Sequence, residues 1–129
     1  MSWSADCNME KKKSYNYEDL LVWQKSMDLV ERVYSVAKIF PSEELYGLTS
    51  QLRRAVTSIP LNISEGHGRG SGKDFKRFLL VARGSAYEVN TILQICLRLG
   101  YIGDDEYVKF REEISEITRM ISGLMRSLG

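Results

Sequence analysis

Apolar side chains recur at intervals of three and four residues along most of this chain, and that spacing is typical of amphipathic helices. Proline or glycine separates four such runs, which cover residues 18–40, 44–69, 73–99 and 104–128. Helices that each present one apolar stripe can share a single core. The pattern therefore predicts an all-α fold: an antiparallel up-down-up-down four-helix bundle in residues 17–129, preceded by a flexible tail in residues 1–16.

The first helix carries two apolar rows. The row that follows the helical spacing most closely consists of Leu20, Trp23, Met27, Val30, Tyr34 and Ala37. A second row widens the apolar face and contains Leu29, Val33 and Val36. A helix with so wide a face is expected to contact neighbours on two sides, as a bundle helix in an oligomer would. After it, Pro41 disfavours helical geometry at Phe40, and Ser42 is suited to cap the next helix.

The second helix has a proline inside its apolar stripe. The stripe consists of Leu45, Leu48, Leu52, Ala55, Ile59 and Ile63. Pro60 cannot donate a hydrogen bond to the carbonyl of Val56, and its ring crowds the preceding turn, so we predict a bend there. Ser58 and Asn62 flank this point and can offer hydrogen bonds to the freed backbone group. Four glycines between Gly66 and Gly72 then end the helix.

The third and fourth helices have long, regular stripes. The third is apolar at Phe75, Phe78, Leu79, Ala82, Ala86, Val89, Ile92, Leu93 and Cys96. Gly84 lies in the middle of this helix, where glycine costs about 1 kcal/mol relative to alanine, so we expect another helix to pass close to it. Gly100 is suited to end the helix, and Asp104 or Asp105 to cap the next one. The fourth helix carries an uncharged seam typical of coiled coils, formed by Tyr107, Phe110, Ile114, Ile117, Ile121, Leu124 and Leu128.

The net charge of +1 conceals an uneven distribution. Residues 53–98 contain eight basic and three acidic side chains, so this segment carries +5 and the remainder −4. Such asymmetry allows a basic surface that binds polyanions; the alternative is a set of ordinary solvated helix faces. The candidate nucleic-acid-binding residues are Arg53, Arg54, Arg69, Lys73, Lys76 and Arg77. The last three share one helix face, because they are spaced by three and four residues.

Motifs for catalysis or metal binding are absent from the sequence, and we expect neither an enzyme nor a cofactor. The one histidine, His67, has no second histidine to share a metal, and Cys7 and Cys96 lack metal-ligand spacing. Glu65 has no activated partner and is expected to pair with a nearby arginine or to cap the bend. The glycine-rich segment before the third helix lacks the strand and the Gly-Lys-Ser/Thr ending of a nucleotide-binding loop. This segment is better suited to bind a phosphate of a nucleic acid than a nucleoside triphosphate, because it combines backbone amides, Arg69 and the N-terminus of a helix.

The sequence also bears on location. Two cysteines in unrelated settings do not form a disulfide framework, which favours the reducing cytoplasm. No stretch approaches the ~18 consecutive apolar residues of a membrane span. No apolar segment follows the lysines at Lys11–Lys13, so we expect neither secretion nor a membrane partner.

One long segment resembles a known family. It reads LYGLTSQLRRA from Leu45 to Ala55 and continues with Ser58-Ile59-Pro60, Asn62-Ile63, Glu65-Gly66 and Gly68-Arg69. The match extends through the third helix to Leu99-Gly100-Tyr101-Ile102 and covers roughly residues 17–128. This pattern is similar to that of a family of small bacterial four-helix bundle proteins. Some of these proteins are encoded within intervening sequences of large-subunit ribosomal RNA genes.

The resemblance implies a homo-oligomer, since relatives form pentameric barrels with a central channel. The family is also similar to an accessory protein of diversity-generating retroelements, which shares this bundle. That protein resembles a basic platform on which nucleic acid and a reverse transcriptase bind. We therefore expect a non-enzymatic homo-oligomer, a homopentamer by this resemblance, that binds nucleic acid. RNA is favoured because relatives lie within ribosomal RNA genes. The alternative is an oligomeric adaptor whose partner is a protein, such as a reverse transcriptase.

Overall fold

The computed structural model describes residues 16–129, so most of the predicted tail, including Cys7, lies outside the described residues. The described part contains four α-helices and no strand, which confirms the predicted all-α four-helix fold. The helices are α2 (Leu21–Ala37), α3 (Leu48–Gly68), α4 (Gly72–Arg98) and α5 (Asp104–Ser127). Two short 3-10 helices, η1 (Tyr17–Asp19) and η2 (Ser42–Glu44), precede α2 and α3.

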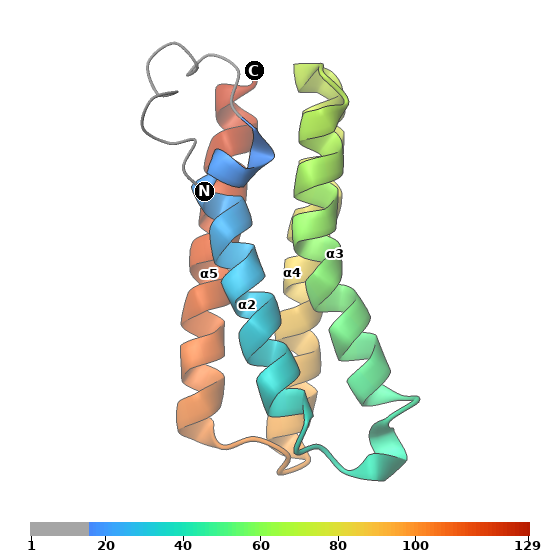
Figure 1. The fold of residues 1–129 in the computed structure, drawn as a ribbon. Coiled ribbons are helices and arrows are strands. Elements are labelled where there is room, and N and C mark those ends of the chain that lie inside the picture. Colours follow the sequence, from blue (N-terminus) through green and yellow to red (C-terminus); the bar gives the residue numbers. More distant parts are fainter. Residues whose placement is uncertain (1–15) are drawn as a thin grey trace.

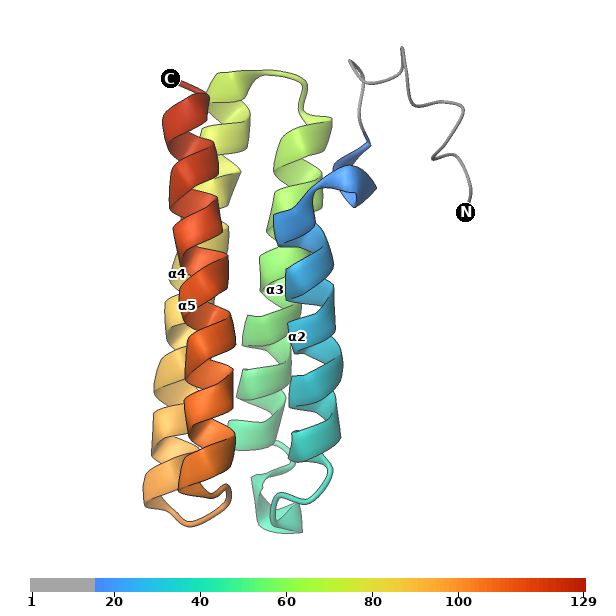
Figure 2. The ribbon, with the colours of Figure 1, turned by 90° about the vertical axis from the view of Figure 1, so that its left-hand side faces the viewer.

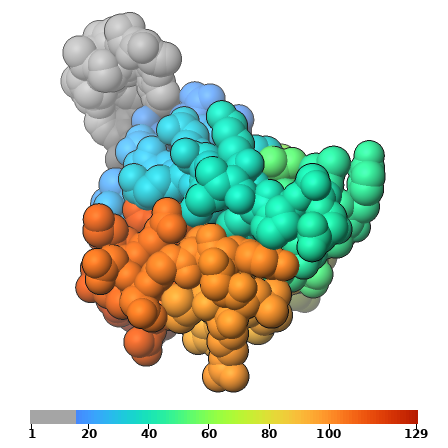
Figure 3. All heavy atoms as spheres, turned by 90° about the horizontal axis from the view of Figure 1, so that it is seen from below, coloured from blue at the N-terminus to red at the C-terminus, as the bar shows by residue number. Residues whose placement is uncertain are grey.

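The four helices surround one core, and the contacting pairs are α2–α3, α3–α4, α4–α5 and α5–α2. Each helix packs against two others, so that α2 lies diagonally opposite α4, and α3 opposite α5. Figures 1 and 2 show the connections at alternating ends of the bundle, with consecutive helices running in opposite directions. The α2–α3 and α4–α5 connections form one end side by side (Figure 3). The α3–α4 connection lies at the other end, next to the C-terminus (Figure 2).

The two apolar rows of α2 are buried to different extents. The narrower second row, Leu29, Val33 and Val36, is buried throughout, whereas only Ala37 of the first row is buried and Leu20, Trp23 and Val30 are partly buried. Met27 and Tyr34 of the first row are 37% and 38% exposed. Both rows fit a helical period, and only the position of α3 and α5 decides which row enters the core. Residues of both rows thus contact the core, and the predicted apolar excess on this helix is present.

The stripes of the other helices pack as predicted. In α5, Tyr107, Phe110, Ile114, Ile117 and Ile121 are buried, and Leu124 and Leu128 are partly buried against the same core. The stripe of α4 is buried except at Phe78, which is half-buried. In α3 the stripe is buried from Leu52 to Ile63, whereas Leu45 lies before the helix and is exposed.

Some helix ends follow the predicted caps and others do not. The Ser71 hydroxyl accepts a hydrogen bond from the Asp74 amide at 3.1 Å and so caps α4. Gly100 ends α4 with a φ of +81°, a left-handed conformation that favours glycine. The predicted cap at Ser42 was wrong, because this residue begins η2 and α3 starts at Leu48. At α5 the capping position is occupied by Gly103 instead of either aspartate.

Pro60 lies inside α3, which is helical on both sides of it; the bend stays a prediction. The flanking polar groups bond to sites other than the Val56 carbonyl. Asn62 Nδ2 donates to the Ser58 carbonyl at 2.8 Å. The hydroxyl oxygens of Ser58 and Ser85 lie 2.7 Å apart and join α3 to α4.

The close helix contact is at a different glycine from the one predicted. A Cβ added to Gly84 would meet nothing within 4 Å, so the expected approach of another helix of this chain is wrong. Gly66, by contrast, is buried in α3, and a Cβ there would lie 2.5 Å from the Cβ of Phe78. The α3–α4 pair is therefore in close contact near the end that carries their connection.

Candidate nucleic-acid interface

The structure separates the six predicted basic residues into two groups. Arg53 and Arg54 lie in the first half of α3, whereas the other four surround the α3–α4 connection. Because a helix rises about 1.5 Å per residue, Arg54 and Arg69 are roughly 22 Å apart along α3. The six residues therefore do not form one continuous patch.

The first group borders a hollow between α2 and α3. This α2–α3 groove has a volume of about 320 Å³ and is lined by Tyr34, Leu45, Tyr46, Ser50, Arg53, Arg54 and Thr57. The guanidinium carbon of Arg53 lies 5.2 Å from the centre of the Tyr34 ring, within cation–π range. Its Nε is buried and has no hydrogen-bond partner among residues 16–129. Arg54 is exposed and donates to the Ser50 hydroxyl.

The second group, which we name the end cluster, consists of Arg69, Lys73, Lys76 and Arg77. Two of its members rest on the same aromatic ring. The guanidinium carbons of Arg69 and Arg77 lie 4.9 and 4.7 Å from the centre of the Phe78 ring. The ring is held in place because Phe78 packs against Gly66, where α3 has no side chain. A half-buried core residue thus positions two arginines from different helices.

Acidic neighbours offset part of the charge of the end cluster. Arg69 pairs with Glu65 at 3.1 Å, as predicted, and Arg77 pairs with Asp74 at 3.4 Å. These pairs are solvent-exposed, where an ion pair contributes at most about 1 kcal/mol and exchanges readily. Within residues 16–129, Lys73 and Lys76 form no ion pair. Four basic and two acidic groups leave the corner with a net positive charge.

Backbone donors add to this corner. The amides in the first turn of a helix lack an intrahelical partner, and the helix dipole makes that end positive. In α4 the Ser71 cap satisfies the amide of Asp74. The amides of Gly72 and Lys73 belong to the same first turn. The arrangement is suited to accept an anion such as a phosphate.

Other candidate groups have structural surroundings. The ring of His67 meets Phe75 edge-on at 5.5 Å, inside the last turn of α3, and packs there. Burial raises the pKa of the Cys96 thiol to about 11, so it is a poor nucleophile. The part of the chain that the structure describes contains no group of three or more potential metal ligands. None of its helices is both long and apolar enough to cross a bilayer.

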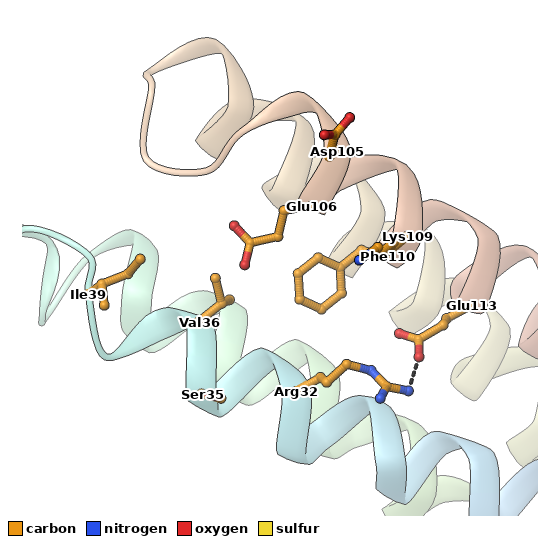
Figure 4. Close-up of a pocket in the computed structure, with 9 residues that line it drawn as sticks. All are labelled: Arg32, Ser35, Val36, Ile39, Asp105, Glu106, Lys109, Phe110 and Glu113. Atoms are coloured by element: carbon orange, nitrogen blue, oxygen red, sulfur yellow. Dashed lines mark hydrogen bonds and ion pairs between the residues drawn. The ribbon is translucent and has the colours of Figure 1, made fainter.

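A larger hollow, of about 490 Å³, lies between α2 and α5 (Figure 4). Its apolar floor includes Val36 and Phe110, and an ion pair between Arg32 and Glu113 closes one side. Three acidic and two basic side chains line it, and no pair resembles a nucleophile with its base. Sequence reasoning did not anticipate this hollow, because it depends on the spacing between two helices that are far apart in the chain.

Comparisons with known proteins agree with this fold. The family model for the 23S rRNA-intervening sequence protein matches residues 18–123. A crystal structure of a protein with unknown function from the S23 ribosomal protein family of Bacteroides thetaiotaomicron superposes with a TM-score of 0.75. The two sequences are 26% identical, and the match covers 81% of this chain and 95% of that one. No curated protein matches this chain.

Proposed function

This chain belongs to the 23S rRNA-intervening sequence protein family, and we propose that it is a non-enzymatic, homo-oligomeric protein that binds nucleic acid through the end cluster. RNA is the favoured ligand, because the family name ties its members to ribosomal RNA intervening sequences. The observation that carries the proposal is the convergence of four basic side chains on the N-terminus of α4.

The end cluster has the chemistry of a phosphate-binding surface. Phosphate oxygens accept hydrogen bonds from arginine, lysine and helix N-terminal amides, and the corner offers all three. Arg69 and Arg77 are partly ordered by the Phe78 ring before any ligand arrives, which reduces the entropy that they lose on binding. Contacts of this kind fix a nucleic-acid backbone but read no bases, so we expect little sequence specificity.

Repetition would strengthen this surface. One corner has only a small excess of positive charge, which gives weak binding by itself. In a homo-oligomer the same corner recurs in every subunit, and several modest contacts on one strand add through effective concentration. The proposal therefore joins two properties, a basic corner and assembly of several copies.

The proposal is tested by reversing the charge of the corner. The variant Lys73→Glu/Lys76→Glu/Arg77→Glu should lose retention of RNA and DNA in a filter-binding assay. A matched control, Lys109→Glu/Arg111→Glu/Arg119→Glu, makes the same change in net charge at exposed positions of α5. We expect the control to keep most of its binding. Equal loss in both variants would contradict the assignment to the end cluster. A wild type without binding would leave the protein-binding adaptor as the function.

A further inference from the structure

The α2–α3 groove brings two aromatic rings together with two arginines. Tyr46 is 92% exposed, more than any other large apolar side chain in residues 16–129, and Tyr34 on α2 is 38% exposed. Arg53 and Arg54 form no ion pair within those residues. No acidic side chain is among the residues that line the groove. Its volume of about 320 Å³ lies near the lower limit for ligand pockets, which is roughly 300 Å³.

Acidic side chains do occur near the groove, but they do not cancel its charge. On α2, Glu31 and Lys38 lie at neighbouring turns and carry opposite charges. The two glutamates of η2 do not line the groove, and one of them, Glu44, accepts hydrogen bonds from a backbone amide and a tyrosine. Glu88 lies in a separate hollow between α3 and α4, which Arg54 also lines, and the two form no ion pair. The charges inside the groove are therefore the two guanidinium groups.

Aromatic rings beside guanidinium groups have the chemistry that recognises unpaired nucleotides. Every nucleobase has a π face that stacks on a tyrosine ring or on the plane of an arginine, and phosphate oxygens accept hydrogen bonds from a guanidinium group. In the groove, the guanidinium carbon of Arg53 lies 5.2 Å from the centre of the Tyr34 ring, so a cation and a ring already lie against each other. A duplex keeps its bases stacked and paired, and it cannot offer a base to these groups unless the base is flipped out.

We propose that the α2–α3 groove binds one unpaired nucleotide of a single-stranded nucleic acid, with the base stacked on Tyr46 and the phosphate held by Arg53 and Arg54. The inference rests on the proposed function and narrows its ligand to single strands. The end cluster cannot make that distinction, because it contacts phosphates, which single strands and duplexes share. Stacking tolerates any base and occurs with RNA and DNA alike, so the groove selects an unpaired strand without reading its sequence.

One side of α3 joins the groove to the end cluster. Figure 1 shows α3 running from the end of the bundle next to η2 to the α3–α4 connection at the other end. Four uncharged residues that are not buried follow Arg54 at steps of three and four and so share its side of the helix: Thr57, Leu61, Ser64 and Gly68. Between Arg54 and Arg69 the one acid is Glu65, which is paired with Arg69 at 3.1 Å. A polyanion can therefore follow this side of α3 without passing an unpaired acid of that helix.

The separation of the two sites sets the length of strand that can use both. Arg54 and Arg69 are about 22 Å apart along α3, and neighbouring phosphates of a stacked strand are about 3.4 Å apart. A stacked strand of roughly seven nucleotides therefore spans the two sites, and an extended strand needs fewer. Affinity should rise steeply as oligonucleotides reach this length, because the first contact makes the second one intramolecular.

Fluorescence anisotropy with a labelled single strand of about 12 nucleotides tests the groove. Tyr46→Ala removes the exposed ring, and we expect the affinity to fall about five- to a hundredfold, the range for the loss of one stacked base. Tyr46→Phe keeps the ring and should bind like the wild type. Tyr87→Ala is the matched control, because it removes a tyrosine that is 57% exposed on α4 and does not line the groove. It should also bind like the wild type, and circular dichroism should show equal helix content in all three variants.

Two further probes separate base stacking from phosphate contacts. An abasic strand of the same length keeps every phosphate but has no base to stack, and a duplex keeps its bases hidden. Tyr46→Ala should therefore leave the affinity for both probes unchanged while it lowers the affinity for RNA and DNA single strands. Equal losses on all the probes, or an unchanged affinity for single strands, would overturn the assignment of the groove.

The variant Lys73→Glu/Lys76→Glu/Arg77→Glu separates this inference from the proposed function. It should weaken the binding of single strands, abasic strands and duplexes alike, because all three share the phosphates that the end cluster contacts. If it does so while Tyr46→Ala has no effect on single strands, the groove assignment is wrong and the proposed function stands. A wild type that binds none of the probes would overturn both.

Discussion

Gly66 of α3 and Phe78 of α4 pack so closely that a Cβ on Gly66 would lie 2.5 Å from the Cβ of Phe78. This contact joins the core to the surface. It fixes the distance between two helices at the end that carries their connection, and it holds the ring on which Arg69 and Arg77 rest. The geometry of the end cluster thus depends on a residue with no side chain.

Replacing this glycine should therefore destabilise the protein. Gly66→Ala forces α3 and α4 apart or displaces Phe78, and overpacking of this kind costs about 1–3 kcal/mol. The free energy of unfolding from a urea titration checks the prediction. Gly68→Ala is the control, because a Cβ there meets nothing within 4 Å, and it should be neutral or slightly stabilising. Equal stability of the two variants would show that the contact is looser than described.

The seam of α5 supports a second prediction. Ile117 is 1% exposed at the centre of that seam, and Ile117→Asp would bury a carboxylate without a partner. Such burial costs several kcal/mol, which is comparable with the stability of a whole domain, so we expect an unfolded chain at room temperature. Thermal unfolding followed by circular dichroism measures this. Val108→Asp, on the exposed side of the same helix, should unfold close to the wild type.

A hydrogen bond between two connections gives a pH-dependent prediction. The Tyr101 hydroxyl donates to the Glu44 carboxylate at 2.9 Å, and this bond raises the pKa of Tyr101 above its ordinary value of 10.0. The folded state thus favours the protonated phenol. The stabilisation is present below pH 10.0 and is lost as the pH rises through the raised pKa. Wild type should exceed Tyr101→Phe in melting temperature at neutral pH, and the difference should shrink in strong alkali. A constant difference would contradict this account of the bond.

Cys96 offers a probe of the core. Its thiol is fully buried, and burial raises its pKa to about 11, so little reactive thiolate is present or accessible in the folded state. In a Cys7→Ser background, where Cys96 is the remaining thiol, a disulfide reagent at neutral pH should react only as fast as the protein unfolds. Urea should accelerate the reaction to the rate of a free thiol. Rapid reaction without urea would show that this part of the core opens locally.

Much of the fold could be predicted because the three- and four-residue spacing of apolar side chains is visible in a single sequence. The seam of α5 was identified correctly, since one face is uniformly apolar and no competing row exists. In α2 two rows compete, and the choice between them depends on where α3 and α5 lie. Glycine positions are similarly ambiguous: the sequence shows that Gly66 and Gly84 lack side chains, but only the packing shows that the first meets a helix and the second meets solvent.

The candidate site was predictable only in part. The count of charged residues identified the basic segment correctly. It did not show that Arg54 and Arg69 are about 22 Å apart, a separation that follows from the length of the helix between them. The role of Phe78 was missed, because its place in the apolar stripe gives it a core function and nothing in the spacing shows that two arginines converge on it. Such a site could be predicted from an aromatic residue at the edge of an apolar stripe when one arginine is close to it on the same helix and another lies just across the connection to the preceding helix.

The salt dependence of nucleic-acid binding by the wild-type protein tests the central claim most directly. Neutralising phosphates releases counterions, so the logarithm of the binding constant should fall linearly with the logarithm of salt concentration. We predict retention of single-stranded RNA at about 50 mM salt and its loss by about 200 mM, the range over which counterion release is clear. A wild type that retains neither RNA nor DNA at the lower concentration, or whose binding does not change with salt, would contradict the account.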